Sequence, residues 1–195
     1  MDLALIVALE SELPEDMCHG IPVYYTGVGK VNAAYATMKA IRDGARYIIN
    51  FGTAGLVKGN LDGLHQVDRI VQRDMLAEPQ APRGTTPFES VTTKGMGPMI
   101  LDTGEIELTK NSNGIIRLGT GDSFVMEHDE WFLDKAVDIV DMEAFAIAKI
   151  CAMEGIEFEC YKWVSDFADE NAAETWEQNQ ADGAQAISDL LKKRI

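Results

Sequence analysis

Short apolar segments alternate along the chain with segments whose apolar residues recur at helical spacing. Residues 3–9, LALIVAL, predict a buried strand, and residues 21–27, IPVYYTG, predict a second one. Residues 30–44 place alanines and aliphatic side chains on one helical face and then reach Gly44, which is typical of a helix and its stop.

The same alternation continues to the end of the chain. Further strands are predicted at residues 45–52, 64–74, 114–121, 136–140 and 156–166, and helices from about 141 and over 174–193. Residues 76–113 are irregular and rich in Pro, Gly and Thr, which is typical of a functional lid, an interface segment or disorder. Strands alternating with helices predict one α/β domain over residues 1–195, with a largely parallel or mixed sheet.

Composition and charge exclude several classes of protein. The net charge of −15 would repel a phosphate backbone, so we expect no nucleic-acid partner. The three cysteines form no CxxC pair and the three histidines have no metal-ligand spacing, so neither a disulfide framework nor a metal site is expected. No run approaches the roughly 18 apolar residues of a membrane span. The N-terminus also lacks the basic start of a signal peptide, so we expect a cytoplasmic protein.

Ligands of such sheets bind outside the carboxyl ends of the strands. Carboxylates and small turn residues follow the predicted strands here: Glu10 and Glu12, GTAG at 52–55, GDSF at 121–124, Asp141 to Glu143, and Asp166. This set favours acid/base chemistry on a small polar ligand over covalent catalysis.

The glycine-rich segments are not phosphate-binding motifs. GVGKVN at 27–32 has Val31 where a Walker loop needs Ser or Thr, and Asn32 where a dinucleotide fingerprint needs glycine. Taken singly, GVGK and GTAG are explained equally well by tight turns between a strand and a helix.

Taken together, six motifs carry a specific resemblance: ALESE, TGVGKVNAA, NFGTAG, TGDSF, VDMEAFAIA and VSDFAD occur in this order. The chain resembles the purine nucleoside phosphorylase/nucleosidase superfamily, and most closely its 5′-methylthioadenosine/S-adenosylhomocysteine nucleosidases. The resemblance implies a three-layer αβα sandwich with a central mixed sheet, a homodimer, a purine nucleoside substrate and no cofactor. It also implies cleavage of the bond between adenine and ribose.

The resemblance assigns roles by matching position. Glu12 would activate water, and Asp166, helped by Ser165, would protonate N7 of the base. Glu143 would accept hydrogen bonds from the ribose hydroxyls. The other implied substrate contacts are Met142 beside the sugar, Phe124 and the Val125 backbone at the base, Val28 and Thr53, Ala54 and Gly55 at the ribose end, Lys162 near the ribose, and Trp176 over the base.

The acid pair in IVDMEAFAIAKI, residues 139–150, divides between two roles. On a helix, two residues correspond to about 200° of rotation, so Asp141 and Glu143 cannot both face one ligand. We expect Asp141 to be the helix N-cap. An acid in the first turn of a helix can also be purely structural, but the six ordered motifs favour a ligand role for Glu143.

Water is the expected nucleophile. Phosphorylases that resemble this chain carry an arginine where Asn50 stands, and a phosphate dianion would face Glu12 with no matching cation. Two alternatives remain open: a phosphate-dependent phosphorylase, and a trimmed protein that binds nucleosides with little activity. The departures from the family pattern keep them open, since Lys162 replaces an arginine and residues 76–90 differ from the loop that relatives extend to a neighbouring subunit.

Overall fold

The computed structural model of the chain describes residues 2–89, 93–108, 116–127, 129–167 and 172–194, while the side chains of 165–167 and 172–180 lie outside the description. The strands of the described ranges are β1 (Leu3–Val7), β2 (Val23–Tyr25), β3 (Tyr47–Leu56), β4 (Gly63–Gln66), β5 (Arg69–Gln72), β6 (Met99–Ile100), β7 (Ile106–Glu107), β8 (Arg117–Thr120), β9 (Ile139–Asp141) and β10 (Glu157–Phe167). The helices are α1 (Lys30–Arg42), α2 (Glu130–Asp134), α3 (Ala144–Glu154) and α4 (Ala172–Leu191), with a short 3₁₀ turn at Glu15–Met17.

One mixed sheet connects all of these strands. Its order is β2-β1-β3-β9-β8-β5-β7-β6, and β10 pairs with both β3 and β4. The pairs β1–β2, β1–β3, β3–β10, β5–β8 and β8–β9 are parallel, whereas β3–β9, β4–β10, β5–β7 and β6–β7 are antiparallel. The predicted mixed sheet is therefore confirmed.

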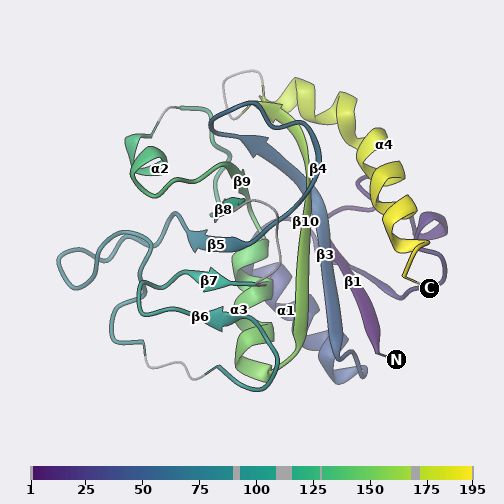
Figure 1. The fold of residues 1–195 in the computed structure, drawn as a ribbon, viewed down its shortest axis with the longest axis horizontal. Helices are drawn as coiled ribbons and strands as arrows, with labels where there is room; N and C mark the ends of the chain where they lie inside the picture. The colour runs from purple at the N-terminus through teal and green to yellow at the C-terminus, as the bar shows by residue number, and fades with distance from the viewer. Residues whose placement is uncertain (1, 90–92, 109–115, 128, 168–171, 195) are drawn as a thin grey trace.

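Two helical layers cover the sheet, as Figure 1 shows, with α1 and α3 on one face and α4 on the other. Alternate residues of β1 and β3 divide between the two faces. Ala4, Ile6 and Ile48 pack in a cluster with residues of α1 and α3. Leu5, Val7, Ile49 and Phe51 pack in a second cluster with Ala184, Ile187 and Leu191 of α4. The three-layer αβα sandwich that the resemblance implies is confirmed.

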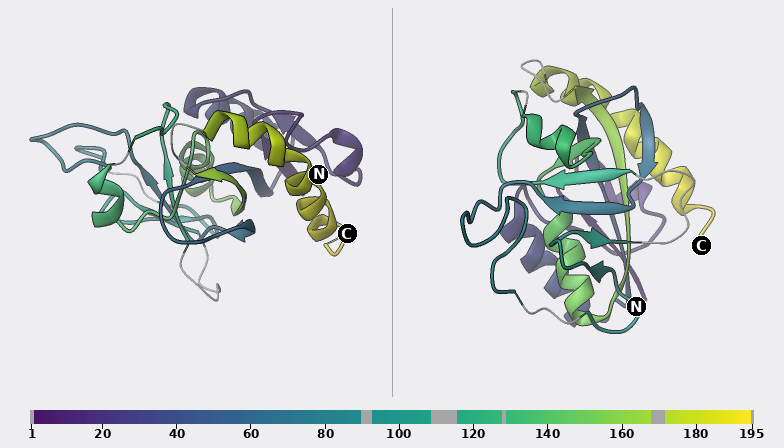
Figure 2. Two further views of the ribbon diagram at one scale, coloured as in Figure 1. Left: turned by 90° about the horizontal axis from the view of Figure 1, so that it is seen from above. Right: turned by 60° about the vertical axis from the view of Figure 1, so that its left-hand side comes forward.

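Helix α4 approaches β10 closely because Gly183 has no side chain. A Cβ atom at this position would lie 2.7 Å from Cγ of Trp163, which is closer than real Cβ contacts. Figure 2 shows the result, with α4 lying along one side of the sheet. Among the described residues, no helix combines the length and the apolar character needed to cross a membrane.

One local prediction is wrong, and one short helix was not predicted. The segment 64–74 is not one strand: β4 pairs with β10, Val67 and Asp68 belong to neither strand, and β5 pairs with β8. Helix α2 at Glu130–Asp134 was not predicted, and it is short enough to carry little periodicity. The long segment 76–113 is mainly irregular where it is described, but it also carries the two-residue strands β6 and β7.

Candidate active site

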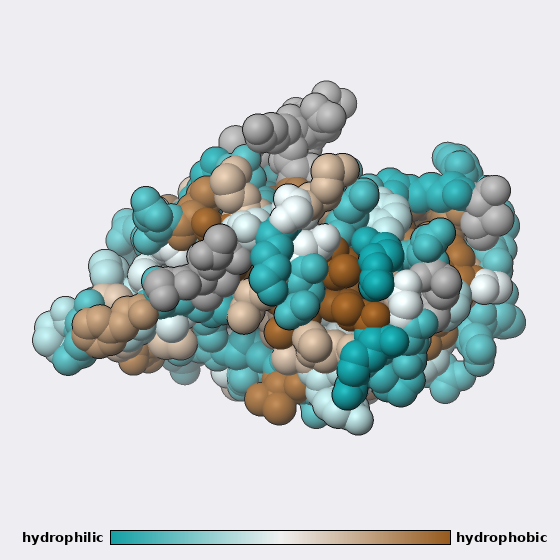
Figure 3. All heavy atoms as spheres, turned by 90° about the horizontal axis from the view of Figure 1, so that it is seen from below, coloured by the Kyte–Doolittle hydropathy of each residue, from teal (hydrophilic) through white to brown (hydrophobic). Residues whose placement is uncertain are grey.

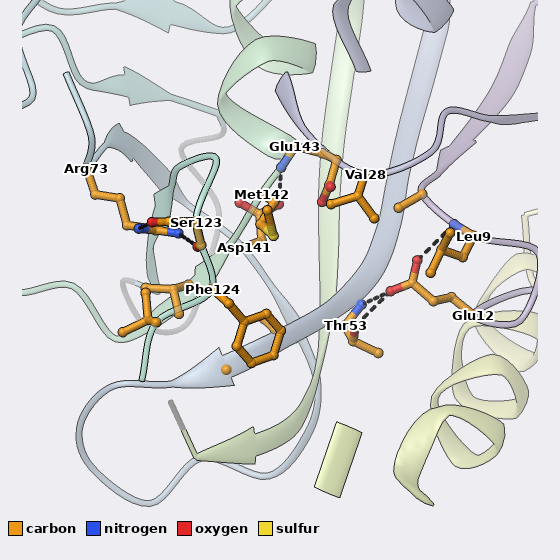
Figure 4. Close-up of a pocket in the computed structure, with 15 residues that line it drawn as sticks. Leu9, Glu12, Val28, Thr53, Arg73, Ser123, Phe124, Asp141, Met142 and Glu143 are labelled. Carbon is orange, nitrogen blue, oxygen red and sulfur yellow. Dashed lines mark hydrogen bonds between the residues drawn. The ribbon is translucent and has the colours of Figure 1, made fainter. Parts of the chain in front are cut away.

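A cavity of about 190 Å³ opens where β1, β3 and β9 end and where the segment after β8 passes over them. Its lining residues come from all of these places: Ala8, Leu9, Glu12, Val28, Thr53, Ala54, Gly55, Arg73, Ser123, Phe124, Val125, Val140, Asp141, Met142 and Glu143. Figure 4 shows Glu12 and Arg73 on opposite sides, with Met142 and Phe124 between them.

Glu12 is held rigidly at one side of the cavity. Its Oε1 atom accepts hydrogen bonds from the Thr53 backbone N–H, at 2.8 Å, and from the Thr53 hydroxyl, at 2.7 Å. Its Oε2 atom accepts from the Leu9 N–H at 3.2 Å. The side chain of Glu12 comes from the turn after β1, while Thr53 lies inside β3, so the parallel pairing of these strands brings them together. The result is a buried carboxylate with a fixed orientation.

Glu143 contributes a second buried carboxylate. It lies at the start of α3, and its Oε1 atom accepts a 2.9 Å hydrogen bond from the Gly29 N–H of the loop before α1. Burial raises the pKa of Glu143 to about 7, and the nearby Asp141 raises it as well, while Lys162 and the Gly29 N–H act in the opposite direction. This side chain therefore changes charge close to neutral pH.

Asp141 binds the start of α3 but does not occupy the N-cap position that the sequence predicts for it. It is the last residue of β9, and Glu143 occupies the N-cap position. The Asp141 Oδ2 atom accepts hydrogen bonds from the N–H groups of Glu143 and Ala144, at 3.3 and 2.9 Å, so it does satisfy the free donors of the helix start. Both residues line the same cavity, but the Asp141 side chain is 1% exposed, so the expectation that only one of the two acids faces a ligand stays a prediction.

Lys162 lies next to Asp141 and is not itself one of the residues that line the cavity. Its Nζ atom is 2.9 Å from the Asp141 Oδ2 atom, and both side chains are 1% exposed. Burial by itself lowers the pKa of Lys162, but Asp141 and other neighbours outweigh this effect, so the pKa lies above its ordinary value. A contact between Lys162 and a substrate stays a prediction.

The opposite side of the cavity carries a residue that the sequence analysis did not select. Arg73 is the first residue after β5, is 4% exposed, and donates hydrogen bonds to the segment 121–123. Burial lowers the pKa of its guanidinium, and Asp74 and Asp141 counteract that effect. The rule that ligands bind beyond strand ends would have selected Arg73 if the predicted strand 64–74 had been ended at Gln72.

The remaining predicted residues divide into two groups. Met142, Phe124, Val125, Val28, Thr53, Ala54 and Gly55 all line the cavity. The side chains of Ser165, Asp166 and Trp176 lie outside the described residues. The backbone of Asp166 is placed in β10 opposite Gly55, directly after a register shift that follows Val164.

A shallower hollow of about 290 Å³ adjoins the cavity. It is lined by residues 28–32, Asp122 and Met142, so Val28 and Met142 belong to both. Within the described part of the chain, no group of three or more His, Cys, Asp or Glu side chains is arranged to hold a metal ion.

Comparisons with known proteins agree with this architecture. Residues 18–195 match the family model described as the phosphorylase superfamily. The chain is 31% identical to the 5′-methylthioadenosine/S-adenosylhomocysteine nucleosidase of Listeria monocytogenes serovar 1/2a, with 86% of this chain and 79% of that protein covered. It is 29% identical to the Staphylococcus haemolyticus protein of the same name, with 87% and 78% covered.

Solved structures show the same fold at lower identity. Futalosine hydrolase of Helicobacter pylori matches with a TM-score of 0.82 and 19% identity over 98% of this chain and 96% of that one. A putative 5′-methylthioadenosine/S-adenosylhomocysteine nucleosidase from Francisella philomiragia matches with a TM-score of 0.83 and 18% identity, covering 100% and 99%.

Proposed function

Since the chain belongs to the phosphorylase superfamily, we propose that it is an N-glycosyl hydrolase acting on adenine nucleosides of the 5′-methylthioadenosine/S-adenosylhomocysteine type. The products are adenine and a ribose derivative. Relatives named as nucleosidases for these substrates support the reaction class. The observation that carries the proposal is the pair of carboxylates Glu12 and Glu143 in the described lining of the cavity, where Arg73 is the one cation and the third acid, Asp141, is already paired with Lys162.

This charge distribution favours water over phosphate as the nucleophile. Arg73 lies across the cavity from Glu12 and is already bound to the segment 121–123 (Figure 4). Asn50, at the position where phosphorylases carry an arginine, is 2% exposed and its Nδ2 atom donates to Ile6 O at 2.9 Å. A phosphate dianion beside Glu12 would meet repulsion, and the described lining offers no cation apart from the already bound Arg73 to offset it.

In the proposed mechanism, Glu12 removes a proton from the attacking water. Its two hydrogen bonds from Thr53 and one from Leu9 fix the carboxylate and keep its orientation during the reaction. Asp166 protonates N7 of the leaving base, because a purine anion is a poor leaving group. The backbone of Asp166 beside Gly55, which lines the cavity, supports this assignment.

Glu143 binds the ribose and stabilises its charge. As the bond between carbon and nitrogen lengthens, the ribosyl group gains oxocarbenium character, and an ionised carboxylate in a dry site stabilises it. The Oε1 atom of Glu143 is occupied by the Gly29 N–H, which leaves Oε2 for the ribose hydroxyls. Met142 packs beside the sugar, Phe124 and Val125 contact the base together with Ser165 and Trp176, and the shared hollow at Val28 and Met142 receives the 5′ substituent.

The assembly proposed is a homodimer, with 1–195 as one domain of each subunit. Hydrophobic side chains that are exposed near the cavity support it: Val31 is 80% and Tyr35 68% exposed, one helical turn apart on α1, and Val28 is 46% exposed. Figure 3 shows a mostly hydrophilic face on which hydrophobic residues reach the surface in separate places.

The three cysteines are free and buried, which supports a reducing, cytoplasmic location.

The test is incubation with a panel of 5′-substituted adenosines and inosine, with and without phosphate, while free base and the sugar product are measured. Hydrolysis predicts adenine and a free ribose derivative at rates independent of phosphate. Formation of ribose 1-phosphate only when phosphate is present would identify a phosphorylase. Adenine binding without any cleavage would identify a binding protein. Asp166→Asn should abolish cleavage while leaving the unfolding temperature unchanged.

A further inference from the structure

Arg73 has a position in the cavity wall that the proposed hydrolysis does not use. It lies across the cavity from Glu12, and it directly follows the C-terminal end of β5. A buried guanidinium carries a large desolvation cost unless its donors are engaged. The identity of its partners therefore indicates what this side chain does.

Those partners all belong to one short segment. The Nη1 atom of Arg73 donates to the Ser123 hydroxyl at 3.0 Å, and Nη2 donates to the Gly121 carbonyl at 3.0 Å and also to the Ser123 carbonyl. The backbone of Gly121 approaches the guanidinium closely, since a Cβ atom there would be 2.9 Å from Cζ and 3.0 Å from Nη1 of Arg73. One planar side chain thus binds three acceptors on two residues, Gly121 and Ser123.

Asp74, the next residue along the chain, binds the same segment by accepting a hydrogen bond from it. The Asp74 Oδ2 atom accepts from the Asp122 N–H at 2.8 Å, and its Oδ1 atom is 2.5 Å from the Lys30 ammonium. The Asp122 carboxylate in turn accepts from the Lys30 N–H at 2.8 Å. From the end of β5, Arg73 therefore binds the carbonyl groups of Gly121 and Ser123, and Asp74 binds the N–H group of Asp122.

This segment needs such support because it lies between β8 and α2 and forms neither helix nor strand. It leads directly into Phe124, which is 49% exposed at the cavity, and into Val125. Since Phe124 is 49% exposed, we expect its position to depend on the preceding backbone.

We propose that Arg73 is a positioning residue that holds the segment 121–123 and so fixes Phe124 as the wall against which the purine base packs. The role rests on the proposed function, because it presumes that a purine base occupies this side of the cavity. Lysine would keep the charge but not the planar fork that reaches three acceptors at once. The effect should be on base binding in the ground state and in the transition state alike, which changes KM more than kcat.

The experiment compares wild type with Arg73→Met, Arg73→Lys and Gly121→Ala, the last of which places a methyl group against the guanidinium. Arg69→Met is the matched control, since Arg69 is the first residue of β5, the strand that Arg73 follows, but it pairs with Glu107 at 3.1 Å, outside the cavity lining. Three quantities are measured: amide hydrogen exchange of residues 119–127, the Kd for adenine, and kcat and KM for 5′-methylthioadenosine.

We expect Arg73→Met and Gly121→Ala to speed exchange of this segment and to weaken adenine binding about ten-fold, which corresponds to about 1.4 kcal/mol. KM should rise by a similar factor while kcat changes less, Arg73→Lys should be intermediate, and Arg69→Met should match wild type. In the Arg73→Met background, Phe124→Ala should weaken adenine binding less than it does in wild type.

Two results would overturn the inference. Unchanged exchange together with unchanged adenine affinity would show that the segment holds itself. Weaker adenine binding without faster exchange would show that Arg73 touches the ligand directly. If Arg73→Met does not fold, Arg73→Lys and Gly121→Ala decide the question. Wild type that binds adenine but cleaves nothing contradicts the proposed hydrolysis alone, whereas wild type that binds no adenine contradicts both.

Discussion

Replacing Lys162 by methionine tests whether a buried charge pair stabilises the part of the protein that carries the cavity-lining residue Asp141. The Lys162 Nζ atom lies 2.9 Å from Asp141 Oδ2, and neither side chain is more than 1% exposed. Asp141 also accepts a 2.6 Å hydrogen bond from the Thr120 hydroxyl and two from the start of α3. The substitution removes the cation and leaves the aspartate buried.

The size of the effect follows from this geometry. At an effective dielectric constant of about 20, unit charges separated by the 2.9 Å of this pair attract by about 6 kcal/mol before desolvation is subtracted. Breaking a buried pair on one side typically costs about 3–5 kcal/mol. Because the hydroxyl and two N–H groups still bind Asp141, we expect the lower end, about 3 kcal/mol. For a chain of this size, that lowers Tm by about 6–12 °C.

The assay is urea unfolding at pH 7.5 of wild type, Lys162→Met, Asp141→Asn and the double variant. The double variant should recover much of the stability that Lys162→Met loses, because no unpaired charge remains. A loss below about 1 kcal/mol in Lys162→Met would refute the reasoning, since that is the range of exposed ion pairs. Equal losses in the single and double variants would show that packing of the lysine chain, and not its charge, is responsible.

Three further outcomes are expected. Glu12→Gln should lower the rate of adenine release by about 10²–10⁴-fold, because the amide cannot take a proton from water; near-normal turnover would contradict the role of Glu12. The folded pKa of Glu143 is about 7, above that of an unfolded glutamate, so its stabilising contribution is complete below about pH 4.5 and is lost as pH rises to 7. Glu143→Gln should therefore be more stable than wild type by up to about 3 kcal/mol at pH 7.5 and equal to it at pH 4.5; a difference independent of pH would argue against this shift. Arg194→Met removes an ion pair of 2.8 Å to Glu159 and two hydrogen bonds of 2.7 Å to tyrosine hydroxyls, and should cost about 1–2 kcal/mol in unfolding free energy with activity retained; a loss of activity at full stability would reveal a link to the site.

The order and type of the main elements were determined by the sequence itself. Residues 3–9, 30–44 and 156–166 predict β1, α1 and β10, and each lies where expected. Buried strands and packed helices carry local patterns of period 2 and 3.6, which a single segment displays without its neighbours. The ordered motifs likewise identified residues such as Thr53 and Met142, which line one cavity.

Contacts between residues far apart in the chain were decided only by the tertiary structure. The sequence predicts segment 64–74 as one strand, yet its two halves pair with β10 and β8, and this division placed Arg73 at a strand end. Asp141 looks like a helix cap in the sequence, and its bond to Lys162 depends on which strands meet beneath α3. Arg73 and Ser123 are 50 positions apart. Local propensity cannot encode such pairs, because their energy exists only once the register of the sheet brings the partners within hydrogen-bonding distance.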